Sequence, residues 1–393
     1  KSNSMIANAY FEYEIIPGLK FKTSYSAYTD NYREGQYAGT YTKTRKGSRS
    51  PVASTAQNKT SNYTVDNTLN YNKEFGKHSI DATALFSVFE EYNESMNIGV
   101  EDLPYKSLWH SLGTGATVTS YGSNLNEYSI VSYMGRINYG FDGKYLLTIT
   151  GRQDGASQLA DGNKWAFFPS AAIGWRMSEE SFVKGLGVFD NLKLRASYGE
   201  VGNNASISPY ATQSNIFQTF YDFDGNPSLG YTINSLANQG VVWERSKELN
   251  FGLDFSLSGI RLSGTVEYYK RNTEDLILDD KVPNSTGFNN VLDNVGEIEN
   301  SGIEVSLNSV NVSKGDFKWS SNLTFTANDD KVVKLAGGIT EDIGNARFVG
   351  ESVKAYYTYK FEGIWQLGQE AEAAEFGQVP GQVRIRDLNG DKK

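Results

Sequence analysis

Apolar and polar residues alternate with a period of two along most of this chain, and helix-period patterns are almost absent. Successive side chains of a β-strand point to opposite faces, so this alternation predicts strands with one apolar face. We count about thirteen such strands, many of about ten residues or more, the length that a tilted strand needs to cross a bilayer. The clearest segments are residues 19–27, 80–88, 249–257, 260–268 and 319–325.

Charged residues in these strands fall on the non-apolar face. Arg136, Arg152, Arg195 and Glu304 all stand out of phase with their apolar neighbours. A face that excludes charge meets either lipid or a protein core. The alternation alone leaves both interpretations open.

The connections between the predicted strands are alternately short and long. One segment, residues 178–191, has an intermediate length. There we expect one helical turn with Ser178 as its N-cap. The short connections are residues 17–18, 74–77, 142–144, 258–259 and 311–317. The long ones are residues 31–60, 93–127, 155–168, 201–247, 274–296 and 330–355. Outer-membrane barrels have short periplasmic turns and long extracellular loops. The order therefore predicts an all-β, antiparallel transmembrane β-barrel rather than a stack of soluble β domains.

Composition narrows the function classes. The chain has 393 residues, a formal net charge of -9, no Cys and two His, at His78 and His110. Nucleic-acid binding has little support without a basic patch, and thiolate or histidine-based sites are nearly excluded. No apolar run reaches 18 residues, and no secretory leader opens the sequence.

Several ordered motifs resemble one protein family. SYMGRINY, GKYLLT and GRQDGAS are followed by GNKW, FPSAAIGW, SEESF and LKLRASYG, which together span residues 132–199. Residues 243–252, 298–302 and 387–391 continue the likeness. Taken in order, these stretches resemble the SusC/RagA family of TonB-linked outer-membrane transporters of Bacteroidota, over nearly the whole chain.

The resemblance implies an integral protein of the bacterial outer membrane with a barrel of about 22 strands, an N-terminal plug and an energised link to TonB. It also implies a SusD-like surface lipoprotein that acts as a lid. Residues 1–393 are then expected to be part of a barrel domain, about thirteen strands long, with the plug and the last strands absent from this sequence. Its surroundings are outer-membrane lipid.

The function that this resemblance implies is TonB-dependent import of oligomeric nutrients, glycan or peptide, and not an enzymatic activity. The alternatives are a passive outer-membrane porin and a soluble β-rich surface adhesin. No cofactor is certain. The acidic residues Glu90, Glu91 and Glu94 are better explained as a solvated rim than as a catalytic pair.

Two sets of residues are candidate binding sites. Aromatic residues of the long loops, which suit stacking on sugars or contact with a lid, are Trp109, Tyr121, Phe217, Phe220 and Tyr221. Asp387, Asn389 and Asp391 have the opening spacing of a calcium loop, but Lys392 stands where such a loop has Gly. An Asx-rich turn without an ion is the alternative.

Overall fold

The computed structural model describes residues 1–47, 49–233, 235–257, 259, 261–388 and 390. Twelve strands form one antiparallel sheet. Their bounds are β1 Ser2–Ile16, β2 Leu19–Ala38, β3 Val52–Phe75, β4 His78–Glu101, β5 Thr117–Phe141, β6 Tyr145–Ala156, β7 Trp165–Arg176, β8 Phe189–Asn203, β11 Glu244–Leu257, β12 Leu262–Lys281, β13 Asn290–Lys314 and β14 Phe317–Lys334. This is the all-β antiparallel architecture that the alternation predicts.

Six short strands form three separate pairs, and the helices are short. The strand pairs are β9 Ile216–Phe223 with β10 Asn226–Ile233, β15 Glu341–Asp342 with β16 Arg347–Phe348, and β17 Phe361–Ile364 with β18 Val383–Ile385. The two α-helices are α1 Ser181–Lys184 and α2 Glu370–Glu375. The 3-10 helices are Leu112–Thr114, Met177–Glu179, Asn284–Thr286, Ala336–Gly338 and Ile343–Asn345.

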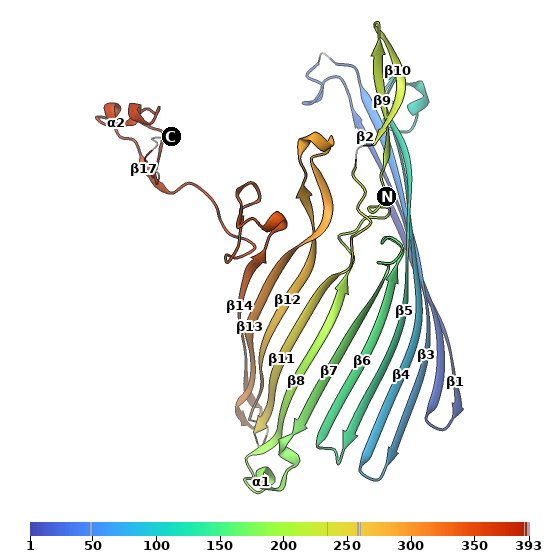
Figure 1. Cartoon of the computed structure of the whole chain (residues 1–393), viewed down its shortest axis with the longest axis vertical. Helices are drawn as coiled ribbons and strands as arrows, with labels where there is room; N and C mark the ends of the chain where they lie inside the picture. Colours follow the sequence, from blue (N-terminus) through green and yellow to red (C-terminus); the bar gives the residue numbers. More distant parts are fainter. Residues whose placement is uncertain (48, 234, 258, 260, 389, 391–393) are drawn as a thin grey trace.

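Sequential strands are neighbours throughout the main sheet, except that β8 pairs with β11 across the long segment that carries β9 and β10. Figure 1 shows a wide, curved wall with short turns at one end and longer connections at the other. The wall is an open arc, with β1 and β14 at its edges. One continuous sheet of this kind is not the stack of soluble domains considered as an alternative.

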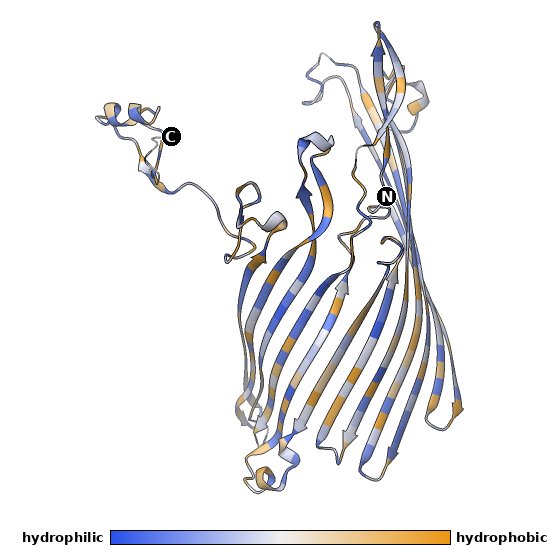
Figure 2. Ribbon diagram, in the orientation of Figure 1, coloured by the Kyte–Doolittle hydropathy of each residue, from blue (hydrophilic) through white to orange (hydrophobic). Residues whose placement is uncertain are grey.

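The register places the apolar residues of neighbouring strands on one face of the sheet. Leu253 pairs with Leu194 on β8 and with Val266 on β12. The same row continues to Val305 and Phe325 on the next two strands. We call this side the apolar face and the opposite side the polar face; Figure 2 shows the alternation along each strand. A one-residue slip would move every apolar side chain to the other face, so the pattern fixes the register.

The turn between β5 and β6 has the conformation that its residues predict. Asp142 and Gly143 have φ of 53° and 66°, and Lys144 N–H donates to the Phe141 carbonyl at 2.9 Å. Two consecutive positive φ angles match the right-handed twist of a hairpin. Asp-Gly is the residue pair that tolerates them.

The helical turn expected in residues 178–191 is present, but its predicted N-cap is wrong. Ser178 lies inside the short Met177–Glu179 3-10 helix, and α1 begins only at Ser181, after Glu180. Neither helix has a side-chain cap hydrogen bond. The chain enters α1 through a tight 3-10 turn instead, which satisfies its backbone groups locally.

Strands β2 to β5 extend far into the segments that the sequence assigns to loops. The pairs Ala38–Val52 and Val52–Glu101 still belong to the ladder, so the connections shrink to residues 39–51 and 102–116. These strands have 20 to 25 residues, whereas β6 and β7 have 12 each. The wall therefore rises much higher at β2 to β5 than at β6 and β7, as Figure 1 shows, and it rises again at β12 and β13, which have 20 and 25 residues.

The aromatic residues Tyr356, Tyr357 and Tyr359 have high strand propensity and predict the start of a thirteenth long strand, but no such strand forms. Residues 356–360 are irregular, and the following strand, β17, pairs with β18. This part of the chain lies apart from the main sheet in Figure 1. A strand exists only where a neighbour pairs its backbone, and beyond β13 the described residues give β14 an isolated parallel bridge, between Val332 and Val349, and no further ladder.

We predict that the two faces respond differently to charge. Leu253→Arg on the apolar face should cost about 2–4 kcal/mol of folding free energy in lipid, whereas Ser256→Arg on the polar face should cost little. Reversible folding of the complete barrel into lipid vesicles, followed by denaturant titration, measures both values. Equal costs on the two faces would contradict this assignment.

Candidate functional site

The polar face carries a charged network on β8, β11 and β12, near the short-turn end of the wall. Arg195 on β8 donates two hydrogen bonds to Asp254 on β11, at 2.8 and 2.9 Å, and one to Glu267 on β12, at 2.7 Å. The guanidinium thus joins three consecutive strands through charge-assisted bonds. The three side chains of the network are partly exposed on this face.

A hollow of about 550 Å³ lies farther up the same face, towards the longer connections. Its walls include the small residues Ser170, Ala172, Ser197 and Gly199 and the ion pair between Arg271 and Glu248. Arg271 Nε donates to Glu248 at 2.8 Å. Small polar residues beside a charged pair leave room for a hydrophilic group against the wall.

Residues 204–215 and 236–243, which we call the covering segment, pack on the upper end of the polar face. Trp243 is 5% exposed and contacts Phe168 edge-on, with ring centroids 5.7 Å apart. Its Nε1–H donates to the Lys164 carbonyl at 2.8 Å. Ile207 and Val241 complete this buried cluster. The covering segment is therefore a packed, ordered part of the wall's mouth.

Buried polar residues anchor the covering segment. Glu244 is 5% exposed, accepts a hydrogen bond from the Ile277 N–H at 2.9 Å and is also bonded by Asn203. Gln158 donates to the Ile207 carbonyl at 2.5 Å and accepts from Asn204 at 2.7 Å. Buried polar groups that are fully paired favour one conformation.

Trp109 packs on the raised part of the wall. Its ring lies directly on Gly35, where an added Cβ would come within 1.9 Å of it, and Arg33 stacks over it at 5.0 Å. Trp109 also borders the buried cluster of Ala53 and Val100. The packing explains Trp109 as part of a loop core on the apolar-face side.

The other four aromatic candidates are exposed and lie in two places. Tyr121 is on β5, 79% exposed, beside a groove on the apolar-face side of the raised wall. Phe217, Phe220 and Tyr221 are on β9 and are 48%, 65% and 69% exposed. The structure thus brings the three β9 residues together and leaves Trp109 and Tyr121 apart from them.

The β9–β10 hairpin projects from the mouth of the wall (Figure 1). Phe220 pairs with Leu229, and Phe217 and Tyr221 pair with Thr232 and Ser228. Large apolar side chains are exposed on both of its faces. An isolated two-stranded hairpin with that surface is marginally stable in water.

The calcium candidates fall largely outside the described residues, because Asn389 and Asp391 are among those not described. Asp387 Oδ1 accepts a hydrogen bond from the N–H of Gly390, three residues further along the chain, at 2.6 Å. Within the described residues, no group of three or more His, Cys, Asp or Glu could hold a metal ion. Calcium binding at Asp387 remains a prediction from the motif.

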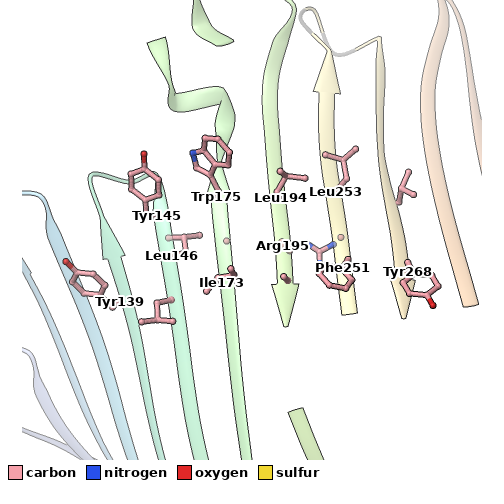
Figure 3. Close-up of a pocket in the computed structure, with 15 residues that line it drawn as sticks. Tyr139, Tyr145, Leu146, Ile173, Trp175, Leu194, Arg195, Phe251, Leu253 and Tyr268 are labelled. Carbon is pink, nitrogen blue, oxygen red and sulfur yellow. The ribbon is translucent and has the colours of Figure 1, made fainter. Parts of the chain in front are cut away.

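A hollow of about 750 Å³ lies on the apolar face, near the short-turn end; Figure 3 shows its lining, which reaches Arg195 where Gly174 and Gly252 flank it in the ladder. Ile173, Leu194, Phe251, Leu253 and Tyr268 surround it. An apolar hollow on a face that excludes charge suits lipid chains, not a hydrophilic solute. We therefore assign it to the membrane-facing surface.

Aromatic residues at this rim have polar partners beyond the strands. Tyr145 O–H donates to Glu180 at 2.7 Å, and Trp175 Nε1–H donates to the same carboxylate at 3.3 Å. Lys144 approaches its other oxygen at 3.2 Å. Rings on the apolar face whose polar ends turn towards charged groups are typical of a membrane interface.

Sequence reasoning missed the partners in these networks. Arg195 stood out because it is out of phase with its apolar neighbours. Its contacts with Asp254 and Glu267 depend on which strands are neighbours and in what register, and only the structure gives both. Glu244 and Gln158 carried no sequence signal, since both lie in or beside a segment read as a long loop.

No helix among the described residues is long and apolar enough to cross a membrane.

The chain resembles known proteins over nearly its full length. The family model for "TonB dependent receptor-like, beta-barrel" matches residues 3–390. TonB-dependent receptor P3 of Formosa agariphila is 35% identical over 407 residues, covering 100% of this chain and 40% of that protein. TonB-dependent receptor SusC of Bacteroides thetaiotaomicron is 33% identical over 253 residues, covering 59% of this chain and 25% of that protein.

A solved structure shows the same fold. The RagAB peptide transporter superposes with a TM-score of 0.82 at 24% identity, over 92% of this chain and 40% of that one. The two-faced wall and these matches define a β-barrel of the outer membrane. The chain belongs to the TonB-dependent receptor-like β-barrel family, with SusC and RagA among its similar proteins, as its motifs predict. It spans about 40% of the length of the curated relatives that it matches over nearly its whole length.

We predict an acid-sensitive contact at the short-turn rim. Hydrogen bonds from Tyr145, Lys144 and Trp175 lower the pKa of Glu180. Its folded-state pKa then lies below the unfolded value of about 4.3, so its stabilisation is present above that value and is lost as pH falls through the folded pKa. Hydrogen exchange of residues 177–188 across pH 3–6 should show protection that falls on acidification, after correction for the intrinsic exchange rate.

Glu180→Gln should reduce that protection at neutral pH and flatten its pH dependence. Glu179→Gln removes the exposed contact with Lys184, which also lowers the pKa of Glu179; it is the matched control and should remove a smaller part of the acid sensitivity than Glu180→Gln. An unchanged profile in Glu180→Gln would refute the role given to this carboxylate.

Proposed function

We propose that the chain forms part of the barrel of a TonB-dependent importer of oligomeric nutrients, glycan or peptide. The observation that carries this proposal is the wall itself: one face is apolar across consecutive strands, and the other carries the Arg195 network and a polar hollow. Such a wall separates lipid from a hydrophilic path. Family membership supports coupling to TonB as the source of energy.

The orientation proposed is that of other outer-membrane barrels, with short turns in the periplasm and long connections outside the cell. The raised strands, the covering segment and the β9–β10 hairpin would then surround the external mouth. Large, ordered connections of this kind are where binding residues concentrate.

A SusD-like lipoprotein is the proposed lid, and the β9–β10 hairpin is its proposed contact. Phe220, Tyr221 and Leu229 expose more than half of their surface in the isolated chain. Burial of exposed apolar rings by a partner would be favourable. The RagAB peptide transporter has the same fold, and its name supports a peptide or other oligomer as cargo.

Cysteine labelling tests the orientation, because the chain has no Cys. Ser120→Cys and Ser214→Cys should react with a membrane-impermeant maleimide on intact cells. Asp316→Cys, in the short turn between β13 and β14, should react only after the outer membrane is permeabilised. The reverse pattern would invert the proposed orientation.

Removal of the hairpin tests the lid contact. The Asn215 N–H donates to Ser235 Oγ at 3.1 Å, so the ends of the hairpin are already adjacent. Replacement of residues 216–233 by a short Gly-Ser linker should leave the barrel folded but reduce co-purification of the lipoprotein and substrate uptake. Unchanged co-purification and unchanged uptake together would show that the hairpin is not the lid contact.

TonB-dependent uptake is the test of the function itself. Cells that carry the complete transporter should accumulate labelled oligomer only when TonB and the proton gradient are intact. Accumulation that persists without TonB would indicate the porin alternative.

A further inference from the structure

A small cavity lies between the raised wall and the covering segment, apart from the Arg195 network. Its volume is about 290 Å³, and it lies where β4 and β5 pass beside residues 209–213. We call it the Glu91 cavity. Its lining includes Glu91, Tyr128, Gln158, Tyr210 and Gln213.

Glu91 is held in position by a chain of hydrogen bonds between polar side chains of β3 and β4. Thr60 Oγ1 donates to Asn93 Oδ1 at 2.7 Å, and Asn93 Nδ2 donates to Glu91 Oε1 at 2.7 Å. A carboxylate offers about four acceptor positions, so capacity for a ligand remains. Glu91 has no ion-pair partner within the described part of the chain, and the cavity is bordered by no Lys, Arg or His.

Tyrosine rings supply two further sides. Tyr128 lies across from Glu91 in the ladder and packs against Phe89, with ring centroids 5.7 Å apart. Tyr210 has φ of 66°, a conformation that is uncommon for a bulky residue and is held by the surrounding turn. Strained residues of this kind concentrate at ligand sites.

The register separates Glu91 from the acidic residues on either side of it. Glu90 pairs directly with Tyr63 and is bonded by the hydroxyl groups of Tyr63 and Tyr92, at 2.5 and 2.8 Å. Glu94 is exposed and shares the parity of Glu90 along β4. Glu90 and Glu127 also border the cavity, but Glu127 pairs with Tyr92 and therefore shares the apolar-face side with Glu90 and Glu94. Glu91 belongs to the polar-face side, where the covering segment packs.

We infer that the Glu91 cavity binds an organic cation, a primary ammonium or guanidinium group carried by the transported oligomer. A single positioned carboxylate neutralises such a group, and adjacent tyrosine rings stabilise it through cation–π contact. The volume suits one side chain or sugar substituent. A hard metal ion would need several oxygen ligands, and no suitable acidic cluster occurs among the described residues.

This inference rests on the proposed import function and narrows its substrate class. Two kinds of oligomer carry the required group: peptides with lysine or arginine, and glycans with free amino sugars. Acetylation of the amine removes the charge in both while keeping the rest of the molecule. Paired probes therefore separate charge recognition from shape.

The test is equilibrium binding to the complete purified transporter with its lid protein, by titration calorimetry. The probes are trilysine and glucosamine trimer, each beside its fully N-acetylated form. The wild type should bind at least one charged probe about tenfold more tightly than its acetylated form. Binding by trilysine alone would assign the cation to peptides, and binding by the amino sugar alone would assign it to glycans.

Glu91→Gln should remove that preference, and Glu94→Gln, on the same strand and the opposite face, should keep it. Tyr210→Ala provides a second variant and should weaken binding of the charged probe several-fold while acetylated probes are unaffected. Equal binding of charged and acetylated probes by the wild type, or a Glu91→Gln variant that matches Glu94→Gln, would overturn the inference.

Uptake in cells separates this inference from the proposed function. Charge-selective binding without TonB-dependent accumulation would contradict import and retain the Glu91 cavity. TonB-dependent accumulation of neutral oligomers by a transporter that shows no charge preference would support import and contradict cation binding in the Glu91 cavity.

Discussion

The structure depends on one constraint: a backbone that crosses lipid must pair its N–H and C=O groups within the protein. Inside the wall, strands meet this requirement by pairing with their sequence neighbours, apart from the β8–β11 contact, whereas the outer edges of β1 and β14 are left open. Once that ladder exists, side chains have only two directions available. The alternation of residue types then decides which side meets lipid and which meets water, and both the Arg195 network and the apolar rows follow from it.

The pairing between β8 and β11 determines how the mouth is built. The forty residues between Asn203 and Glu244 must leave and re-enter the wall at adjacent positions. The chain uses part of that length to pack Trp243 and Ile207 against the polar face, and part to extend the β9–β10 hairpin. A single long connection therefore supplies both a rigid, buried element and an exposed one.

Much of the wall was predictable because its signal is local. Leu249, Phe251 and Leu253 reveal a strand without knowledge of their neighbours, and Asp142-Gly143 reveals a turn. The upper parts of β2 to β5 were not predictable, since residues such as Gln57 and Ser95 give no hydropathy contrast although the ladder continues through them. The expected strand at Tyr356 shows the opposite failure, in which aromatic content suggested a strand and no neighbour was present to pair it.

The candidate sites were harder to predict because they depend on contacts between distant segments. Trp109 is aromatic and lies in a loop, but its position on Gly35 makes it a packing residue. Glu91 was read with Glu90 and Glu94 as one solvated rim, and only the register separates it from them.

The unequal strand lengths determine the shape of the rim. Twelve extra residues at about 3.3 Å each raise one side of the wall by up to about 40 Å along the strand direction. The rim is lowest at β6 and β7, between the taller strands β2 to β5 on one flank and β12 and β13 on the other, so molecules diffusing from the medium would reach the opening within a restricted range of approach angles.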